Sequence, residues 1–292
     1  MQAGLPSAFA TSSPRPARTN PSRSLDNTAN LSMTPELMIT LGDELYSALN
    51  ARNTLEPLTD RCPDMTIEDA YRVQQRVVGR RLDAGETVVG KKIGVTSKAV
   101  MDMLGVYQPD FGYLLSGMVY GEGQTIALDT LIQPKAEGEI AFILKKDLIG
   151  PGITNAEVLA ATECVMPCFE IVDSRIRDWK IKIQDTVADN ASCGVFVLGD
   201  RAVSARAVDL STCGMVLEKN GEIIGTGAGA AALGSPVNAV AWLANTLGRL
   251  GIPLKAGEVI LSGALAAMAV VKPGDNFRVS IGGIGSCSVR FA

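Results

Sequence analysis

The chain has 292 residues, of which 47% are hydrophobic and 20% are charged, and its formal net charge is −4. This length and apolar content are sufficient for one large domain or two small ones with a sizeable core. The acidic balance argues against nucleic acid as the main partner, and no apolar run approaches the roughly 20 residues of a membrane-spanning helix. The sequence contains no histidine, which excludes histidine-dependent nucleophilic triads, zinc sites and acid–base catalysis.

Residues 1–32 are rich in Ser, Pro, Arg and Asn. A segment of this composition cannot contribute to a core, so we expect a disordered extension. Its arginines and serines are typical of an organellar transit peptide, but it contains no convincing amphipathic helix. We favour the alternative that translation naturally starts at Met33.

Residues 33–124 alternate helical and strand-like patterns, and we predict an N-terminal α+β region there. Thr34 and Pro35 are typical of an N-cap and a first helical residue, and leucines recur after them with helical spacing. Thr66 begins a capping-box pattern that predicts a second helix as far as about residue 84. Three further elements are expected: a strand at 88–95, a short helix at 97–104 and a loop at 108–112.

Residues 125–292 consist of short strand-like runs separated by Gly, Pro and Asn turns, which predicts a β-rich domain. Asn220-Gly221 between two such runs predicts a two-residue hairpin, and one helix is expected at 236–250. The fold class is therefore α+β, with a helical N-terminal part and a large mixed, mostly β C-terminal domain. The expected strands are 137–144, 168–173, 193–198, 213–218, 222–225, 258–263, 267–272 and 276–291.

Three glutamates stand inside apolar, strand-like runs: Glu137, Glu139 and Glu170. In a strand over 137–144, Glu137 and Glu139 share one face about 7 Å apart, while the alternate apolar residues take the other face. Two carboxylates at this distance repel each other, and burial of either one without a partner is costly. A divalent cation removes both costs, and oxygen ligands without histidine or paired cysteine favour Mg²⁺ or Mn²⁺. The alternative is that Glu137 and Glu139 line the solvent face of an edge strand.

Other charged residues are further candidates for a site. If Lys91 points to water from its strand, Lys92 points inward, where a lysine either pairs with a carboxylate or takes part in chemistry. Asp110 is either a site residue or only a turn residue. The runs 173–179 and 185–192 are dense in hydrogen-bonding groups, which is typical of loops that carry sites and equally of structural capping networks.

The glycine-rich run 225–230 matches a G-x-G-x-x-A dinucleotide fingerprint, but we expect no such cofactor. The fingerprint requires a βαβ unit and an acidic residue about 20 positions further on. This run follows a hairpin instead, and the residue at that distance is Asn245. We therefore expect the glycines to serve close backbone packing or a tight turn.

The chain contains six distinctive segments: GKKIGVTSKAV (90–100), LGVYQPDFGYL (104–114), IQPKAEGEIAFIL (132–144), CFEIVDSRIRDWKIKIQDTVADNASCGVFVLG (168–199), LGSPVNAVAWLANTLG (233–248) and ILSGAL (260–265). These segments resemble the 2-hydroxypenta-2,4-dienoate hydratases (2-keto-4-pentenoate hydratases), which are metal-dependent enzymes of the meta-cleavage pathways for aromatic compounds. The resemblance covers residues 33–292. The wider superfamily includes 4-oxalocrotonate decarboxylase and fumarylacetoacetate hydrolase, but the Trp-Lys-Ile after Asp178 and the Ala-Ser-Cys-Gly after Asn190 look more like a hydratase than a decarboxylase.

The resemblance implies a fumarylacetoacetate hydrolase-like fold and a set of site residues in a catalytic domain over 125–292 together with the preceding region. Three carboxylates would hold Mg²⁺ or Mn²⁺, two residues would perform acid–base chemistry, and one would lie near the substrate. The implied residues are Glu137, Glu139 and Glu170 as metal ligands, Lys92 and Asp110 for acid–base chemistry, and Ser192 near the substrate.

The implied reaction adds water to 2-hydroxypenta-2,4-dienoate and yields 4-hydroxy-2-oxopentanoate. One alternative is 4-oxalocrotonate decarboxylation, which acts on a second carboxylate and so requires an extra cation in the pocket. Another is cleavage of a C–C bond in acylpyruvates by the same three acidic residues. A non-enzymatic partner subunit is the remaining alternative, which an intact set of site residues disfavours.

The cellular setting follows from composition and from the resemblance. None of the six cysteines forms a C-x-x-C pair, which suits reduced thiols in a cytoplasmic protein. We expect a small 2-hydroxydienoate or 2-oxo acid as substrate and further copies of the chain in a homo-oligomer. The decarboxylase or aldolase of the same pathway is an additional candidate partner, and we expect no nucleic acid and no membrane.

Overall fold

The computed structural model describes residues 33–292, except for the side chains of Ala99, Met103 and Leu104. The expected disordered extension, residues 1–32, lies outside the described residues. Within 33–292, none of the helices combines the length and hydropathy that crossing a bilayer requires. The helices are α1 (Pro35–Ala51), α2 (Leu58–Arg61), α3 (Ile67–Asp83), α4 (Lys98–Leu104), α5 (Asn155–Ala161), α6 (Ile183–Ala188) and α7 (Pro236–Gly248).

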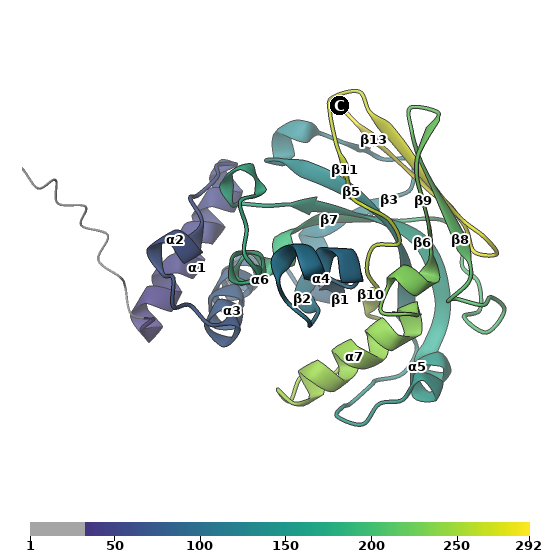
Figure 1. The fold of residues 1–292 in the computed structure, drawn as a ribbon, viewed down its shortest axis with the longest axis horizontal. Helices are drawn as coiled ribbons and strands as arrows, with labels where there is room; N and C mark the ends of the chain where they lie inside the picture. The colour runs from purple at the N-terminus through teal and green to yellow at the C-terminus, as the bar shows by residue number, and fades with distance from the viewer. Residues whose placement is uncertain (1–32) are drawn as a thin grey trace, which may run out of the picture.

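The two long N-terminal helices begin at the residues that the capping patterns predict. The Thr34 side chain accepts a hydrogen bond from the Leu37 amide at 3.2 Å and starts α1. Thr66 and Asp69 form a reciprocal capping box at the start of α3. Together with α2 and α6, these helices bury an apolar cluster of their own on one side of the molecule (Figure 1). The helical N-terminal part is therefore confirmed.

The strands form two sheets. The first has eight strands in the order β2-β1-β10-β5-β6-β7-β3, with β11 also paired to β5, and the second has five in the order β4-β13-β12-β8-β9. Parallel and antiparallel pairs both occur, so the mixed, mostly β architecture is confirmed, while the boundary between 33–124 and 125–292 stays a prediction. The strands are β1 (Val88–Gly94), β2 (Asp110–Leu115), β3 (Val119–Gly121), β4 (Thr125–Ile126), β5 (Pro134–Leu144), β6 (Thr162–Asp173), β7 (Cys193–Leu198), β8 (Gly214–Lys219), β9 (Glu222–Ala228), β10 (Val259–Leu261), β11 (Ala269–Val270), β12 (Asn276–Ile281) and β13 (Gly285–Phe291).

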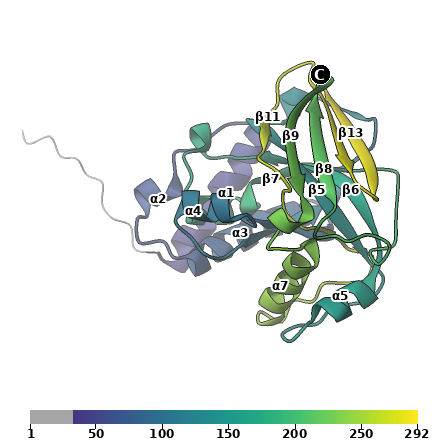
Figure 2. The same ribbon diagram turned by 45° about the vertical axis from the view of Figure 1, so that its right-hand side comes forward.

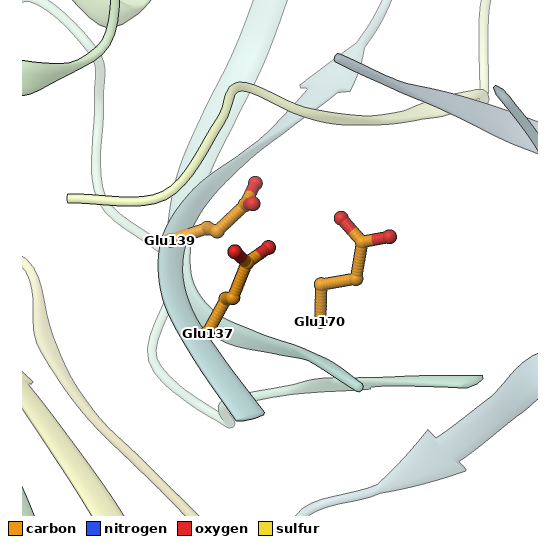
Figure 3. A group of neighbouring side chains, drawn as sticks. All are labelled: Glu137, Glu139 and Glu170. Carbon is orange, nitrogen blue, oxygen red and sulfur yellow. The ribbon is translucent and has the colours of Figure 1, made fainter. Parts of the chain in front are cut away.

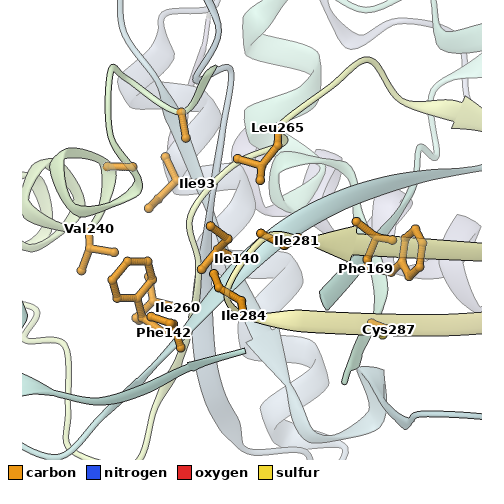
Figure 4. Close-up of a cluster of buried hydrophobic side chains, with 14 of the residues drawn as sticks. Ile93, Ile140, Phe142, Phe169, Val240, Ile260, Leu265, Ile281, Ile284 and Cys287 are labelled. Carbon is orange, nitrogen blue, oxygen red and sulfur yellow. The ribbon is translucent and has the colours of Figure 1, made fainter. Parts of the chain in front are cut away.

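The main apolar core lies where α7 and the second sheet cover one face of the first sheet. Phe142 of β5, Val240 of α7 and Ile260 of β10 belong to this core (Figure 4). Phe169 of β6 meets Phe277 of β12 edge to face, with ring centroids 6.3 Å apart. Figure 2 shows α5 and α7 beside each other at one end of the strands. These contacts hold the central strands of the first sheet in a fixed position.

The two faces of β5 are divided as the alternation predicts. Ile140 and Phe142 are fully buried in the main core, whereas Glu137 and Glu139 point to the opposite face of the sheet. The edge-strand alternative for these glutamates is wrong, because β5 lies between β10 and β6 in the middle of the sheet.

Some expected elements differ from the structure. The loop at 108–112 is wrong in its second half, because Asp110 begins β2, which pairs with β1 in the antiparallel sense. The single strand at 276–291 is two strands, β12 and β13, joined by a turn that contains Gly282 and Gly283. The short helices α2, α5 and α6 were not predicted, since one or two turns show too little periodicity to be recognised.

The glycine patterns in the second sheet serve backbone geometry. Asn220 and Gly221 join β8 to β9 with φ angles of 54° and 86°, as a type I′ hairpin turn requires, so this prediction is confirmed. A Cβ atom on Gly227 would collide with the carbonyl of Leu265. Close backbone packing in the run 225–230 is therefore confirmed.

A matched pair of isoleucines tests the position of the core. Ile260 is 0% exposed and Ile149 is 70% exposed. Ile260→Ala should lower the free energy of unfolding by about 2–5 kcal/mol, because it leaves a cavity among packed side chains. Ile149→Ala should change it by less than about 0.5 kcal/mol. Urea unfolding measures both values, and equal losses in the two variants would contradict this core.

Candidate metal centre

Two neighbouring strands bring three carboxylates together. Glu137 and Glu139 come from β5, and Glu170 comes from β6, whose antiparallel register places it directly opposite Glu137. One carboxylate oxygen from each glutamate lies within 4.8 Å of the others (Figure 3). Glu139 is 1% exposed and Glu170 is 0% exposed. The pairing of β5 with β6 therefore brings Glu170 next to two acids that lie more than 30 residues earlier in the chain.

The carboxylates have few hydrogen-bond donors for their charge. Burial and then the charge of Glu170 raise the pKa of Glu137 to about 7 and the pKa of Glu139 well above its usual range. The Gly263 amide donates to one Glu139 oxygen at 2.8 Å. The other Glu139 oxygen and both Glu170 oxygens accept no hydrogen bond from the described residues. Apart from the ion pair that Lys92 makes with Glu170, these buried oxygens lack donors, and such a ligand set fits a hard divalent cation.

Lys92 lies between the carboxylates, with its Nζ atom 3.1 Å from Glu170 Oε1. Burial alone would lower the pKa of Lys92, but the charges of Glu170 and Asp110 outweigh burial and raise it. Lys92 is therefore protonated at neutral pH. The condition that Lys91 points to water does not hold. Lys91 is 3% exposed and lies 2.6 Å from a Glu258 oxygen, because β1 lies between β2 and β10 and its residues from Gly90 to Ile93 are buried on both faces.

Asp110 is the first residue of β2 and pairs with Gly94 of β1. Burial raises the pKa of the Asp110 carboxyl. A Cβ atom at position 94 would collide with Asp110 Oδ1 and lie 3.4 Å from Lys92 Nζ. Glycine at this position therefore leaves the space in which the ammonium and the carboxylate lie near each other.

Ser192 ends a turn in which Asn190, Ala191 and Ser192 all have positive φ angles of 54°, 50° and 51°. Non-glycine residues in this left-handed region are strained by about 1–2 kcal/mol each. The Asn190 side chain holds the turn against β2, because it accepts from the Tyr113 amide at 2.8 Å and donates to the Tyr113 carbonyl at 2.9 Å. The Ser192 hydroxyl is thereby fixed 3.1 Å from the Thr186 hydroxyl.

A buried ion pair supports the same turn. Arg175 donates to the Asp189 carboxylate and, at 3.0 Å, to the Cys193 carbonyl. Asp189 also accepts a hydrogen bond from the Ser192 hydroxyl at 3.4 Å. Burial raises the pKa of Asp189 to about 6, although Arg175 opposes this effect. The network ties the end of β6 to the start of β7 and places Ser192 between them.

The site residues face one cavity of about 450 Å³. Lys92, Asp110, Glu137 and Ser192 line it, whereas Glu139 and Glu170 are not among its lining residues. The structure thus brings all six candidate residues into one region, although their roles stay predictions. The remaining wall is largely apolar and includes Val100, Val172, Trp179, Ile181 and Met268.

Several residues that shape the site were not assigned from the sequence. Thr186 and Asn190 lie in the run 185–192, whose density of polar groups was the available signal. Gly94 leaves space for the Asp110 carboxylate, and the Gly263 amide donates to Glu139. The local sequence around each glycine does not indicate which carboxylate it contacts. Such contacts depend on strand pairing over long separations in the chain.

The raised pKa values of the glutamates predict an unusual pH dependence in metal-free protein. Between about pH 4.5 and 7 the folded Glu137 and Glu139 hold protons that the unfolded chain has lost. The native state then binds more protons than the unfolded state, so the free energy of unfolding should decrease as the pH rises through this window. Saturating Mg²⁺ should remove or reverse this decrease, because a cation binds ionised carboxylates.

Urea unfolding across this pH window, with EDTA or with Mg²⁺, measures the effect. The double variant Glu137→Gln/Glu139→Gln is the control, and it should lose both the pH-dependent decrease and the response to Mg²⁺. A variant that keeps the wild-type pH profile would contradict the assignment of these carboxyls.

Comparison with known proteins places this geometry in a family. The family model described as fumarylacetoacetate (FAA) hydrolase, C-terminal, matches residues 93–292. The 2-hydroxypent-2,4-dienoate hydratase of Pseudomonas putida is 70% identical over 221 residues, which are 75% of this chain and 100% of that protein. The 2-hydroxyhexa-2,4-dienoate hydratase of Comamonas testosteroni is 59% identical over 254 residues, which are 86% of this chain and 96% of that protein.

A solved structure of 4-oxalocrotonate decarboxylase from Pseudomonas putida G7, complexed with magnesium and adipate, has the same fold. It is 40% identical in sequence, covers 90% of this chain and 100% of its own, and superposes with a TM-score of 0.86. A structure of the same enzyme with calcium and acetate gives a TM-score of 0.85. With the curated relatives, these matches establish that the chain belongs to the fumarylacetoacetate hydrolase family and, within it, to the 2-hydroxypenta-2,4-dienoate hydratases.

Proposed function

We propose that this protein is a metal-dependent hydro-lyase that adds water to 2-hydroxypenta-2,4-dienoate and forms 4-hydroxy-2-oxopentanoate in the meta-cleavage catabolism of aromatic compounds. The observation that carries the proposal is the group of three clustered carboxylates, two buried and one partly buried, with Lys92 and Asp110 beside it, at one cavity. The sequence identity of 70% to a 2-hydroxypent-2,4-dienoate hydratase supports this choice of substrate.

The ion is proposed to be Mg²⁺ or Mn²⁺, held by Glu137, Glu139 and Glu170. Their all-oxygen donor set favours a hard cation over a soft one. A bound divalent ion supplies positive charge that attracts the carboxylate and 2-oxygen of the substrate and withdraws electrons from its conjugated chain. The structure of the 40% identical decarboxylase with magnesium supports Mg²⁺.

Side chains of the protein are proposed to carry out the proton transfers of the reaction. Ketonisation of the dienol requires a proton at C5, addition of water at C4 requires removal of a proton from that water, and a second proton reaches C3. Lys92, which is protonated between two carboxylates, is proposed to stabilise the enolate and to deliver a proton. Asp110 is proposed as the general base or the group that positions water, and Ser192 as a hydrogen-bonding partner of the substrate.

The lining of the cavity favours the hydratase over the decarboxylase. Decarboxylation of 2-oxohex-3-enedioate requires a pocket for a second carboxylate. Among the described residues that line this cavity, Lys92 is the single cation, and it faces the carboxylates of the metal centre. Most of the other lining residues are apolar, which suits the uncharged end of a pentadienoate.

The proposal also includes the cellular location and the partners of the protein. Six cysteines without a disulfide support a cytoplasmic location. We propose that the chain forms a homo-oligomer, and the decarboxylase or the aldolase of the pathway is its candidate partner.

Loss of the ultraviolet absorbance of 2-hydroxypenta-2,4-dienoate tests the function. The protein should remove this chromophore in the presence of Mg²⁺ or Mn²⁺ and not in the presence of EDTA, and mass spectrometry should find one added water in the product. Release of CO₂ from 2-oxohex-3-enedioate or cleavage of an acylpyruvate at a higher kcat/KM would replace the hydratase assignment. Absence of metal-dependent turnover on all three substrates would favour a non-enzymatic role.

Substitutions at Lys92 and Asp110 test their roles. Lys92→Ala and Asp110→Asn should each lower kcat by about 10²–10⁴-fold, the range of general acid–base contributions. Calorimetry should show that Mg²⁺ affinity is retained, because neither residue is a proposed ligand. Lys145→Ala removes a surface lysine and should keep wild-type turnover. Near-normal turnover in both site variants would discard the assigned roles.

A further inference from the structure

A second lysine lies close to the cavity without lining it. Lys135 lies two residues before Glu137 on the same face of β5. Its pairing partner on the neighbouring strand β6 is Val172. Val172 and Glu137 both line the cavity, whereas Lys135 does not. The charge of Glu137 attracts the Lys135 ammonium, but the ion pairs of the described residues do not include Lys135. A half-buried cation that is not closed into an ion pair beside a substrate cavity calls for a physical explanation.

The Trp179 ring accounts for the position of this cation. The Lys135 Nζ atom lies 4.2 Å from the centroid of the Trp179 ring, which is a cation–π contact. Trp179 itself lines the cavity. The indole is therefore in contact with the cavity and with the ammonium, and the ammonium is kept out of the cavity wall.

The backbone of Trp179 is held in an unfavourable conformation to present the ring in this way. Asp178 and Trp179 have positive φ angles of 56° and 57°, which are uncommon for a bulky residue and persist only when the surroundings fix them. The Trp179 Nε1 atom donates to the Gln133 carbonyl at 3.0 Å. This bond lays the ring along the start of β5, over Lys135.

We propose that Trp179 is a specificity-determining residue that restricts the cavity to monocarboxylates by covering Lys135. The proposal rests on the proposed function, because it concerns the charge of the substrate that the same site accepts. A 2-oxo acid bound at the carboxylate end of the cavity directs its far end toward the apolar wall that contains Val172 and Trp179. A methyl or vinyl group is accommodated there, whereas a second carboxylate would lose hydration without gaining a cation.

Removal of the ring should reverse this preference. Without the indole, the Lys135 ammonium becomes accessible from the cavity, at about 7 Å from Glu137 along the strand, and it can pair with a distal carboxylate. Lys135 would then supply the cation that a dicarboxylate substrate requires. The change in preference should depend on Lys135 and not on Lys180, the lysine next to Trp179 in the chain.

Calorimetric binding of two matched acids in the presence of Mg²⁺ tests the proposal. The probes are 2-oxohexanoate and 2-oxoadipate, which have the same chain length and differ in the distal carboxylate. The wild-type protein should bind 2-oxohexanoate more tightly. Trp179→Gly, in which glycine adopts the positive φ without strain, should shift the affinity ratio toward 2-oxoadipate by about tenfold.

Further variants test whether the shift arises because the Trp179 ring no longer covers Lys135. Adding Lys135→Met to Trp179→Gly should abolish the shift, whereas adding Lys180→Met should leave it, because Lys180 is exposed and pairs loosely with Asp178. Trp179→Phe keeps a ring and should keep the wild-type ratio. If the glycine variant fails to fold, Trp179→Asn replaces it, since asparagine also tolerates this backbone region. Mg²⁺ affinity is measured in parallel in every variant.

A shift that persists without Lys135, or an equal change in affinity for both acids, would overturn the proposal. Because binding is measured without turnover, failure of the proposed function is recognised separately. A wild-type protein that does not hydrate the dienoate refutes the proposed function, whereas an active protein whose ratio does not shift in Trp179→Gly refutes only the role of Trp179.

Discussion

Mutual repulsion among three clustered carboxylates is the constraint on which the rest of this structure depends. Glu139 and Glu170 are buried and Glu137 is partly buried, so the group loses hydration, and Lys92 supplies one positive charge to it. Such a cluster is unfavourable by itself, because buried charges without partners cost several kcal/mol each. A fold can hold it only with a rigid frame, which here is the pairing of two long central strands, β5 and β6, over a large apolar core.

The frame extends to the acid–base residues through contacts with the N-terminal helices. Gln74 of α3 donates to the carbonyls of Phe111 and Val187 at 2.9 and 3.0 Å. The Tyr71 ring stacks on the Phe111 ring with centroids 4.3 Å apart. Phe111 follows Asp110, so α3 fixes the strand residue next to the proposed base. The helical part and the β-rich part therefore build one site between them.

Strained backbone is concentrated around the same cavity. Val95, Trp179, Ala191 and Ser192 all line it and all have positive φ angles between 50° and 57°. A β-branched or bulky residue in this region is held there by its neighbours at a cost in stability. Stability is thus reduced at the cavity wall, and the wall side chains gain fixed positions that more relaxed turns would not provide.

The sequence allowed the elements with strong local signals to be predicted. The caps at Thr34 and Thr66, the alternation through β5 and the Asn220-Gly221 turn were all found where the patterns indicated them. The missed strand β2 lacks such a signal, because its stability comes from pairing with β1. Lys91 was misplaced for the same reason, since whether a strand is covered on one face or on both is a property of the sheet.

By itself, the amino-acid sequence determined the chemistry that is available: oxygen ligands, no histidine, and acidic residues on one face of a predicted strand. Backbone sterics and the two-residue period of a strand are local, so they can be read along the chain. Only the tertiary structure decided that Glu170 stands opposite Glu137, that Gly94 leaves space for Asp110, and that Trp179 covers Lys135. These contacts join residues across strands and loops, where register and packing set the distances and the local sequence does not.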